Sequence, residues 1–172
     1  QPVTTDLYLP ALPALAVSMR APMSAAQLTL SALIICFGVA QLVWGPLADR
    51  FGRRPILLAG LTLYSLAAAA ATLSPSIEWL IGWRALQGAG MAASVACGRS
   101  IVRDLYEPRE GARVMSRALG GLGIVALVSP LLGGLLAHHA SWQVALGAVS
   151  LFGMATLAIV ALRFEETLRH LN

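Results

Sequence analysis

Long runs of apolar residues alternate with short polar breaks along this chain. A helix needs about 20 apolar residues to cross the hydrocarbon of a bilayer, and five of the runs are long enough. A sixth run, at the start of the chain, is shorter and looks like the interior of a helix whose beginning is missing. The predicted spans cover about 1–18, 26–48, 55–74, 77–99, 114–137 and 143–163, and a polar tail follows at 164–172. The pattern therefore predicts an all-α membrane protein with no room for a soluble domain between its spans.

The composition agrees with this prediction and argues against several kinds of function. Of the 172 residues, 58% are hydrophobic and 12% are charged, whereas a soluble domain has about 25% charged residues. The sequence contains no Ser-His-Asp, Cys-His or paired-carboxylate pattern with catalytic spacing. His138 and His139 are adjacent, but a metal ion needs more ligands than these two. The sequence therefore gives no support for an enzyme, a metal site or a bound cofactor.

The basic residues indicate which side of the membrane each loop occupies. All twelve are arginines. If the spans alternate in direction, one side carries Arg50, Arg53, Arg54, Arg99, Arg103, Arg109, Arg113, Arg117, Arg163 and Arg169. The opposite side carries Arg20, and Arg84 lies inside a span. Because cytoplasmic loops are rich in basic residues, the arginine-rich side is predicted to be cytoplasmic. No aromatic residues interleave these arginines as a nucleic-acid surface would require, so nucleic-acid binding is not expected.

The densest charge cluster is the stretch "GPLADRFGRRP" at 45–55, between the second and third spans. Gly45 and Gly52 allow a tight reversal of the chain, and Pro55 suits the first turn of the next helix. On charge alone, an ordinary positive-inside turn explains this stretch equally well.

The order of the residues in this stretch resembles the loop between helices two and three of the major facilitator superfamily. The resemblance implies a latch, in which acidic and basic side chains contact neighbouring helix ends, including those of the opposite half of a transporter. Its residues here are Gly45, Asp49, Arg50, Gly52, Arg53 and Arg54. Asp104, at the inner end of the fourth span, is the expected partner of Arg53.

Three further stretches resemble the same superfamily. "IGWRALQGAGMAAS" at 81–94 is similar to the helix-four motif, and "SPLLGG" at 129–134 is similar to the core of the helix-five antiporter motif. Val125 departs from the upstream half of that motif, where a small residue is usual. "TDLYLPALP" at 5–13 is similar to the helix-one motif of the bicyclomycin/chloramphenicol-resistance (Bcr/CflA) branch of drug–proton antiporters. The residues that match the antiporter core are Pro130, Gly133 and Gly134.

The resemblance covers the whole chain, as the first six of twelve helices with the start of the first helix truncated. It implies a proton-coupled multidrug efflux transporter of the bacterial inner membrane. The implied partners are small-molecule drugs, protons, the lipid bilayer and a missing C-terminal half. Two alternatives stay open: a transporter of another small solute, such as a sugar or nucleoside, and a truncated membrane fragment that does not transport.

Asp6 is the first candidate for proton coupling. From Asp6 to Ser18, where the first span ends, a helix rises about 18 Å, and half of the hydrocarbon is about 15 Å thick. Asp6 is therefore predicted near the midplane if its helix continues upstream. A carboxylate there costs about 2.5–3.5 kcal/mol on insertion scales, and burial favours the neutral form of a carboxyl group. Asp6 could thus couple proton binding to transport; the alternatives are an interfacial position near a genuine terminus and a purely structural carboxylate.

Arg84 is the second candidate, because it lies inside the fourth span. Its long side chain could extend outward to the interface, or it could face a polar cavity inside the bundle, where intramembrane charges usually have partners. Asp6 is the only acidic residue within the spans that could serve as its partner. The estimated depths of Asp6 and Arg84 in the membrane differ by about 9 Å, so direct contact is not assured. Gln87 lies on the same helix face and is expected to share the cavity. The resemblance links this arginine to proton coupling.

Prolines and glycines inside the spans predict local features of the helices. Pro10, Pro13 and Pro130 each remove a backbone donor and can kink a helix. Gly88 and Gly90 fit GxGxxA, but they lie in a membrane span without a preceding strand, which argues against a dinucleotide site. Close helix packing explains these small residues better.

Overall fold

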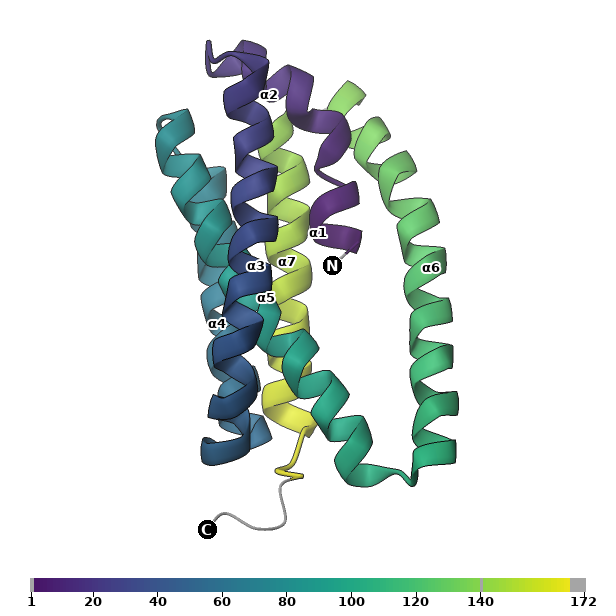
Figure 1. The fold of residues 1–172 in the computed structure, drawn as a ribbon. Helices are drawn as coiled ribbons and strands as arrows, with labels where there is room; N and C mark the ends of the chain where they lie inside the picture. The colour runs from purple at the N-terminus through teal and green to yellow at the C-terminus, as the bar shows by residue number, and fades with distance from the viewer. Residues whose placement is uncertain (1, 140, 168–172) are drawn as a thin grey trace.

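The computed structural model describes residues 2–139 and 141–167, and every regular element in this part of the chain is a helix (Figure 1). The elements are α1 (Pro2–Asp6), the short 3-10 helix η1 (Leu9–Ala11), α2 (Leu12–Ser18), α3 (Met23–Phe51), α4 (Arg53–Thr72), α5 (Ile77–Leu105), α6 (Pro108–His139) and α7 (Trp142–Arg163). The linker predicted at 164–172 lies within the described residues only as far as Thr167, and the side chains of His138 and His139 lie outside them.

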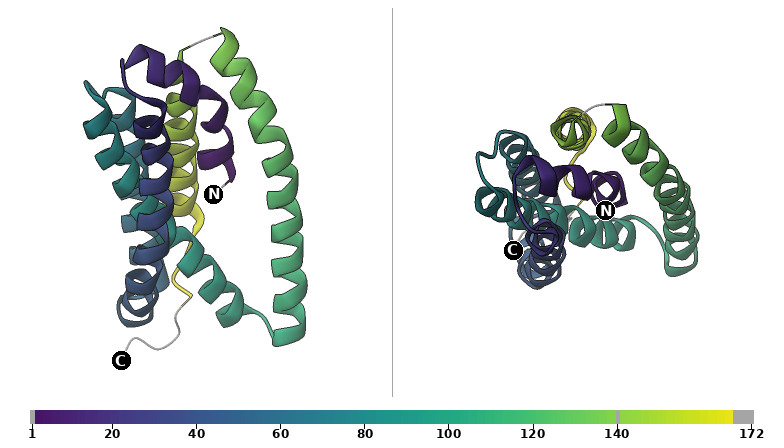
Figure 2. Two further views of the ribbon diagram at one scale, coloured as in Figure 1. Left: turned by 45° about the horizontal axis from the view of Figure 1, so that its top comes forward. Right: turned by 90° about the horizontal axis from the view of Figure 1, so that it is seen from above.

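The long helices run up and down, as the sequence predicts. The turn between α3 and α4, the connection between α5 and α6, and the end of α7 all lie at one end of the bundle (Figure 1). This end carries the described arginines that were predicted to be cytoplasmic, so we call it the inner end. Helix α5 packs against α3 and α4, and α4 packs against α7. Seen from above, α6 lies at the edge of this group (Figure 2).

Four helices in the described part of the chain are long and apolar enough to cross a membrane: α3, α4, most of α6, and α7. Helix α5 has the same length as α3, 29 residues, but it carries Arg84 and Gln87 in its interior. The prediction of a span at 77–99 is thus correct for the helix but overestimated its apolarity. The physical reason is that both polar side chains are completely buried and therefore face the inside of the bundle and not lipid.

The first predicted span, 1–18, is not one helix, which corrects the sequence prediction. It consists of α1, η1 and α2 in succession. In a continuous α-helix, the carbonyl of Asp6 would accept a hydrogen bond from residue 10 and that of Leu9 from residue 13. Both of those residues are prolines, which have no N–H to donate. The prolines therefore divide the span rather than only bending it.

The two helix ends that differ most from the prediction both lie at the inner end. Helix α5 continues to Leu105 rather than 99, and α6 begins at Pro108 rather than 114. Charged residues are frequent in these two extensions, which include Arg103, Asp104, Arg109, Glu110 and Arg113. Apolar runs mark the part of a helix that lies in hydrocarbon, and helices continue beyond it into the headgroup region.

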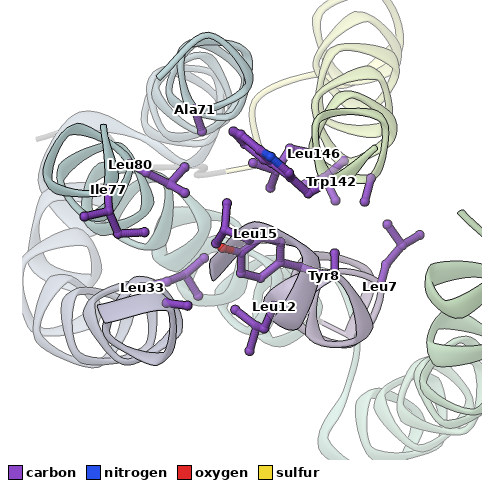
Figure 3. Close-up of a cluster of buried hydrophobic side chains, with 14 of the residues drawn as sticks. Leu7, Tyr8, Leu12, Leu15, Leu33, Ala71, Ile77, Leu80, Trp142 and Leu146 are labelled. Atoms are coloured by element: carbon purple, nitrogen blue, oxygen red, sulfur yellow. The ribbon is translucent and has the colours of Figure 1, made fainter. Parts of the chain in front are cut away.

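The centre of the bundle is filled by apolar side chains from several helices. In Figure 3, Tyr8 and Leu15 of the first span lie between Leu33 of α3, Leu80 of α5 and Leu146 of α7. All five of these side chains are at least nine-tenths buried. The divided first span is therefore anchored in the core along its outer half, which fixes where its polar residues lie.

Helices α3, α4 and α5 approach each other with backbone against backbone. A Cβ atom added at Gly88 of α5 would collide with the backbone of Leu33 in α3. A Cβ atom at Gly90 would lie 2.6 Å from the backbone nitrogen of Tyr64 and 2.7 Å from the carbonyl oxygen of Gly60, both in α4. The prediction of close helix packing at Gly88 and Gly90 is confirmed. Trp44 of α3 adds a hydrogen bond, in which Nε1–H donates to the carbonyl of Ala89 at 2.7 Å.

Candidate functional site

Arg84 lies inside the bundle and is completely buried, so it does not extend outward to the interface. Its Nη1 donates to Oε1 of Gln87 at 2.7 Å, and its Nη2 donates to the carbonyl oxygen of Thr4 at 3.3 Å. Its guanidinium carbon lies 4.3 Å from the centre of the Tyr8 ring. Gln87 is also completely buried. The structure thus places Arg84 and Gln87 together, as predicted, and adds two residues of the first span.

Two tyrosines connect this cluster to the neighbouring helices. The hydroxyl of Tyr8 forms a hydrogen bond with Oγ1 of Thr29 in α3 at 2.9 Å. The hydroxyl of Tyr64 in α4 forms one with Oγ1 of Thr4 at 2.6 Å. Arg84 is therefore surrounded by a buried polar cluster that joins α1, α3, α4 and α5. Sequence reasoning did not identify Tyr8, Tyr64 or Thr4, because isolated tyrosines and threonines in apolar runs are typical of any helical core.

Asp6 is the last residue of α1 and is half-buried. Its Oδ1 accepts a hydrogen bond from Oγ1 of Thr5 at 2.8 Å. Among the residues that the structure describes, Asp6 forms no ion pair with Arg84. Helix α1 lies about midway along the height of the bundle in Figure 1, and Asp6 follows two residues after Thr4, which contacts Arg84. Arg84 of α5 thus contacts the short helix that carries Asp6, but the two charges do not pair.

A small cavity adjoins this cluster between α1, α4, α5 and α7. Its volume is about 120 Å³, and its lining includes hydroxyl groups and apolar side chains. A drug-sized ligand needs about 300–1,000 Å³, whereas one water needs about 30 Å³. The cavity is therefore of a size for a few waters and not for a drug. The residues that line it are Thr4, Leu61, Tyr64, Met91, Ser94, Phe152, Gly153 and Thr156.

A second charged cluster lies at the inner end of the bundle. The side chain of Arg53 is 2% exposed, and its Nη1 pairs with Oδ1 of Asp49 in α3. Its Nε pairs with Oδ2 of Asp104 in α5 at 3.0 Å. The predicted contact between Arg53 and Asp104 is confirmed. Because the three residues come from α3, α4 and α5, the cluster ties three helix ends together.

The other predicted latch residues have different surroundings. Gly45 lies inside α3, which continues to Phe51, so the chain reverses at Gly52 alone and not at both glycines. Gly52 has φ +100°, a conformation that favours glycine. Arg54 donates from Nη2 to the carbonyl of Ala161 at the end of α7, at 3.1 Å. Arg50 lies over the ring of Phe51, with its guanidinium carbon 5.4 Å from the ring centre.

Glu166 is a residue of this cluster that sequence reasoning missed. Its carboxylate accepts hydrogen bonds from the backbone N–H groups of Arg53 and Arg54, each at 2.9 Å. These are the first two residues of α4, whose N–H groups have no partner within the helix. The carboxylate therefore caps α4 from 112 residues away in sequence. The available signal was a pair of glutamates directly after the last span, on the same side as the arginine-rich loop.

We expect Glu166→Ala to lower the free energy of unfolding by about 1 kcal/mol, because it leaves two N–H groups of α4 without their acceptor. Glu165→Ala is the matched control, since Glu165 is its exposed neighbour and should change stability little. The measurement is unfolding of the purified protein by sodium dodecyl sulfate in mixed micelles. Equal stabilities for the two variants would contradict the capping role.

The predicted antiporter motif lies in α6, and only part of it touches the first span. A Cβ atom at Gly133 would collide with the backbone of Leu7, whereas one at Gly134 would meet nothing within 4 Å. Pro130 lies inside α6 and is exposed. Val125, the residue that departs from the motif, lines a cavity of about 350 Å³ between α6 and α1. The close contact is thus made at Gly133, directly beside the residue that follows Asp6.

Comparisons with known proteins match nearly the whole chain. Residues 3–171 match the family model described as "Major Facilitator Superfamily". The chain is 38% identical to a chloramphenicol resistance protein of Pseudomonas aeruginosa over 160 residues, which are 92% of this chain and 38% of that protein. It is 34% identical to multidrug resistance protein D of Escherichia coli K12 over 137 residues, which are 80% of this chain and 35% of that protein.

A solved structure supports the same fold. The human organic anion transporter MFSD10 (TETRAN) superimposes with a TM-score of 0.66 at 23% sequence identity, over 93% of this chain and 38% of that one. At this identity the likeness concerns the fold alone. The chain spans 35–42% of the length of three curated relatives that it matches, and it aligns with their N-terminal region.

Proposed function

Because the chain belongs to the Major Facilitator Superfamily, we propose that it is the N-terminal half of a proton-coupled drug exporter of the bacterial inner membrane. In this proposal, the complete transporter exchanges a drug for protons by drug–proton antiport. The two halves rock against each other, so that a site near the membrane midplane opens to one side and then to the other.

Three findings support this proposal over the other candidates. Relatives at 34–38% identity are named for chloramphenicol and multidrug resistance. The chain covers about two fifths of those proteins, as expected for one half of a two-half transporter. The cavity that Thr4 and Tyr64 line next to the Arg84 cluster is too small for a drug, which agrees with a substrate site that a second half completes.

The observation that carries the proposal is the buried cluster around Arg84, next to the half-buried Asp6. A charged group inside a membrane protein is costly and usually serves transport or coupling. In the proposed cycle, Asp6 takes up a proton from the outer side, releases the drug and then loses the proton to the cytoplasm. The membrane potential assists this inward movement by about 2.3 kcal/mol per charge for each 100 mV. Arg84 and Gln87 provide the polar environment in which the drug and the proton compete.

The decisive experiment uses the complete transporter that contains this chain, reconstituted in inverted vesicles. We expect Asp6→Asn to abolish chloramphenicol uptake driven by a pH gradient, because asparagine cannot bind and release a proton. Drug counterflow without a gradient should remain, since the substrate path is unchanged. The control is Glu78→Gln, which removes an exposed carboxylate at the outer end of α5 and should leave both activities intact. Gradient-driven uptake by Asp6→Asn at the wild-type rate would refute the assignment.

The same vesicles separate the alternatives. A transporter of another small solute would show no chloramphenicol uptake in the wild type, while a panel of sugars and nucleosides would reveal its substrate. A non-transporting fragment would move none of these compounds even as the complete gene product.

A further inference from the structure

The charge of Arg84 has no counter-charge in the described part of the chain. The ion pairs described there belong to Arg53, at the inner end. Arg84 instead contacts three neutral groups: the amide oxygen of Gln87, the carbonyl of Thr4 and the ring of Tyr8. A completely buried guanidinium needs compensation for its lost hydration. Two hydrogen-bond acceptors satisfy two of its five N–H donors, and Nε has no acceptor. The aromatic ring face therefore provides a major part of the remaining compensation for the lost hydration.

The ring of Tyr8 is fixed in place by a directed hydrogen bond. Thr29 donates its hydroxyl proton to the carbonyl of Ala26 at 2.6 Å. A threonine hydroxyl has one proton, so the Tyr8 hydroxyl must be the donor in its 2.9 Å bond to Thr29. Tyr8 is completely buried, and this bond ties its ring edge to α3. The ring face is therefore held in a defined position beneath Arg84, where a cation is attracted to it.

The second contact of Arg84 with the first span is fixed in a similar way. Its acceptor is the carbonyl of Thr4. The side chain of Thr4 is itself hydrogen-bonded to Tyr64 of α4. Asp6 lies between Thr4 and Tyr8 in sequence, and both of these neighbours contact Arg84. Its own carboxylate accepts a hydrogen bond from Thr5. The guanidinium of Arg84 is thus held by a residue before Asp6 and a residue after it in sequence, and the carboxylate of Asp6 takes no part.

We propose that the ring face of Tyr8, in place of a carboxylate, positions Arg84 in the transport cycle. Arg84 then stays charged while Asp6 binds and releases its proton, because holding Arg84 does not require Asp6 to be ionised. Tyr8 is a positioning residue in this scheme, acting through Arg84 and not on the drug. The inference rests on the proposed drug–proton exchange. It specifies why the position of Arg84 does not depend on whether Asp6 is ionised.

Fluorinated side chains test this role with little change in packing. In the complete transporter, Tyr8 is replaced by phenylalanine and by phenylalanine with one, two or three ring fluorines. Fluorine withdraws electrons from the ring face and weakens its attraction for a cation. We expect Tyr8→Phe, which keeps the ring but loses the hydrogen bond to Thr29, to lose part of the gradient-driven chloramphenicol uptake, and the logarithm of the rate to fall further and steadily with each fluorine. Tyr8→Leu, which has no ring, should transport about thirtyfold more slowly.

The control is the same fluorine series at Phe37, an aromatic residue of the same core in α3, where the rates should not change. A flat series at Tyr8, or equal rates for Tyr8→Phe and Tyr8→Leu, overturns the inference. If Tyr8→Leu does not fold, the fluorine series decides alone, and thermal unfolding in detergent verifies that each of its members is folded. If the rate of chloramphenicol uptake by the wild type does not depend on the pH gradient, the proposed function is overturned instead, whatever the fluorine series shows.

Discussion

Arg84→Met is expected to abolish the proposed proton-driven drug transport while changing the stability of the protein by no more than about 2 kcal/mol. The reason is that Arg84 is a completely buried cation without a described counter-charge. Replacing a buried charge by an apolar side chain of similar volume is often neutral or stabilising. The buried acceptors on Gln87 and Thr4 lose their donor, which costs about 1–3 kcal/mol each and opposes this gain. Function should therefore be lost without a matching loss of stability.

Arg84→Lys refines this prediction. Lysine keeps the positive charge but lacks the planar guanidinium that lies over an aromatic face, so transport should fall without disappearing. The control is Arg99→Met, which removes an exposed arginine from the same helix and should affect neither property. The two measurements are gradient-driven chloramphenicol uptake and unfolding in mixed micelles. Full transport by Arg84→Met, or a loss of several kcal/mol in its stability, would show that Arg84 is structural.

The double change Asp49→Asn with Asp104→Asn is expected to lower the free energy of unfolding by about 3–5 kcal/mol. It leaves the buried guanidinium of Arg53 without either of its carboxylates. Of the single changes, Asp104→Asn should be the more harmful, since Asp104 is 20% exposed and Asp49 is 59% exposed. Solvent already screens much of the interaction with Asp49.

Removing the cation should be less harmful than removing its two partners. In Arg53→Met, an apolar side chain fills the buried position, and the carboxylates that remain can be hydrated. We expect this variant to retain more stability than the double asparagine variant, as measured by unfolding in mixed micelles. The reverse order would mean that the cluster stabilises the fold mainly through the packing of Arg53.

The sequence predicted those parts of the fold that depend on local properties, namely the length of an apolar run and the charge at a helix end. The spans follow from apolar length, and the contact of Arg53 with Asp104 follows from opposite charges at two inner helix ends. The division of the first span was foreseen only as a kink, because the effect of Pro10 and Pro13 depends on how the freed carbonyls find other partners. The same limit explains why Gly45 was assigned to the turn, although α3 continues through it.

The surroundings of Arg84 could not be predicted, for a different reason. Its partners Thr4 and Tyr8 are about 80 residues away in sequence, and a periodic pattern carries no information about such pairs. Tyr8 and Tyr64 read as ordinary core residues, since an aromatic in an apolar run usually is one. Glu166 was missed likewise, because its acceptor role exists only once α7 ends beside the start of α4.

The glycine contacts described above have a mechanical consequence. Where Gly88 and Gly90 press α5 against the backbones of α3 and α4, no layer of side chains exists over which the helices could slide. We therefore expect these three helices to resist sliding past one another. Helix α6 touches the first span at Leu7 through Gly133, one residue beyond Asp6. A displacement of α6 would therefore push on the backbone next to Asp6.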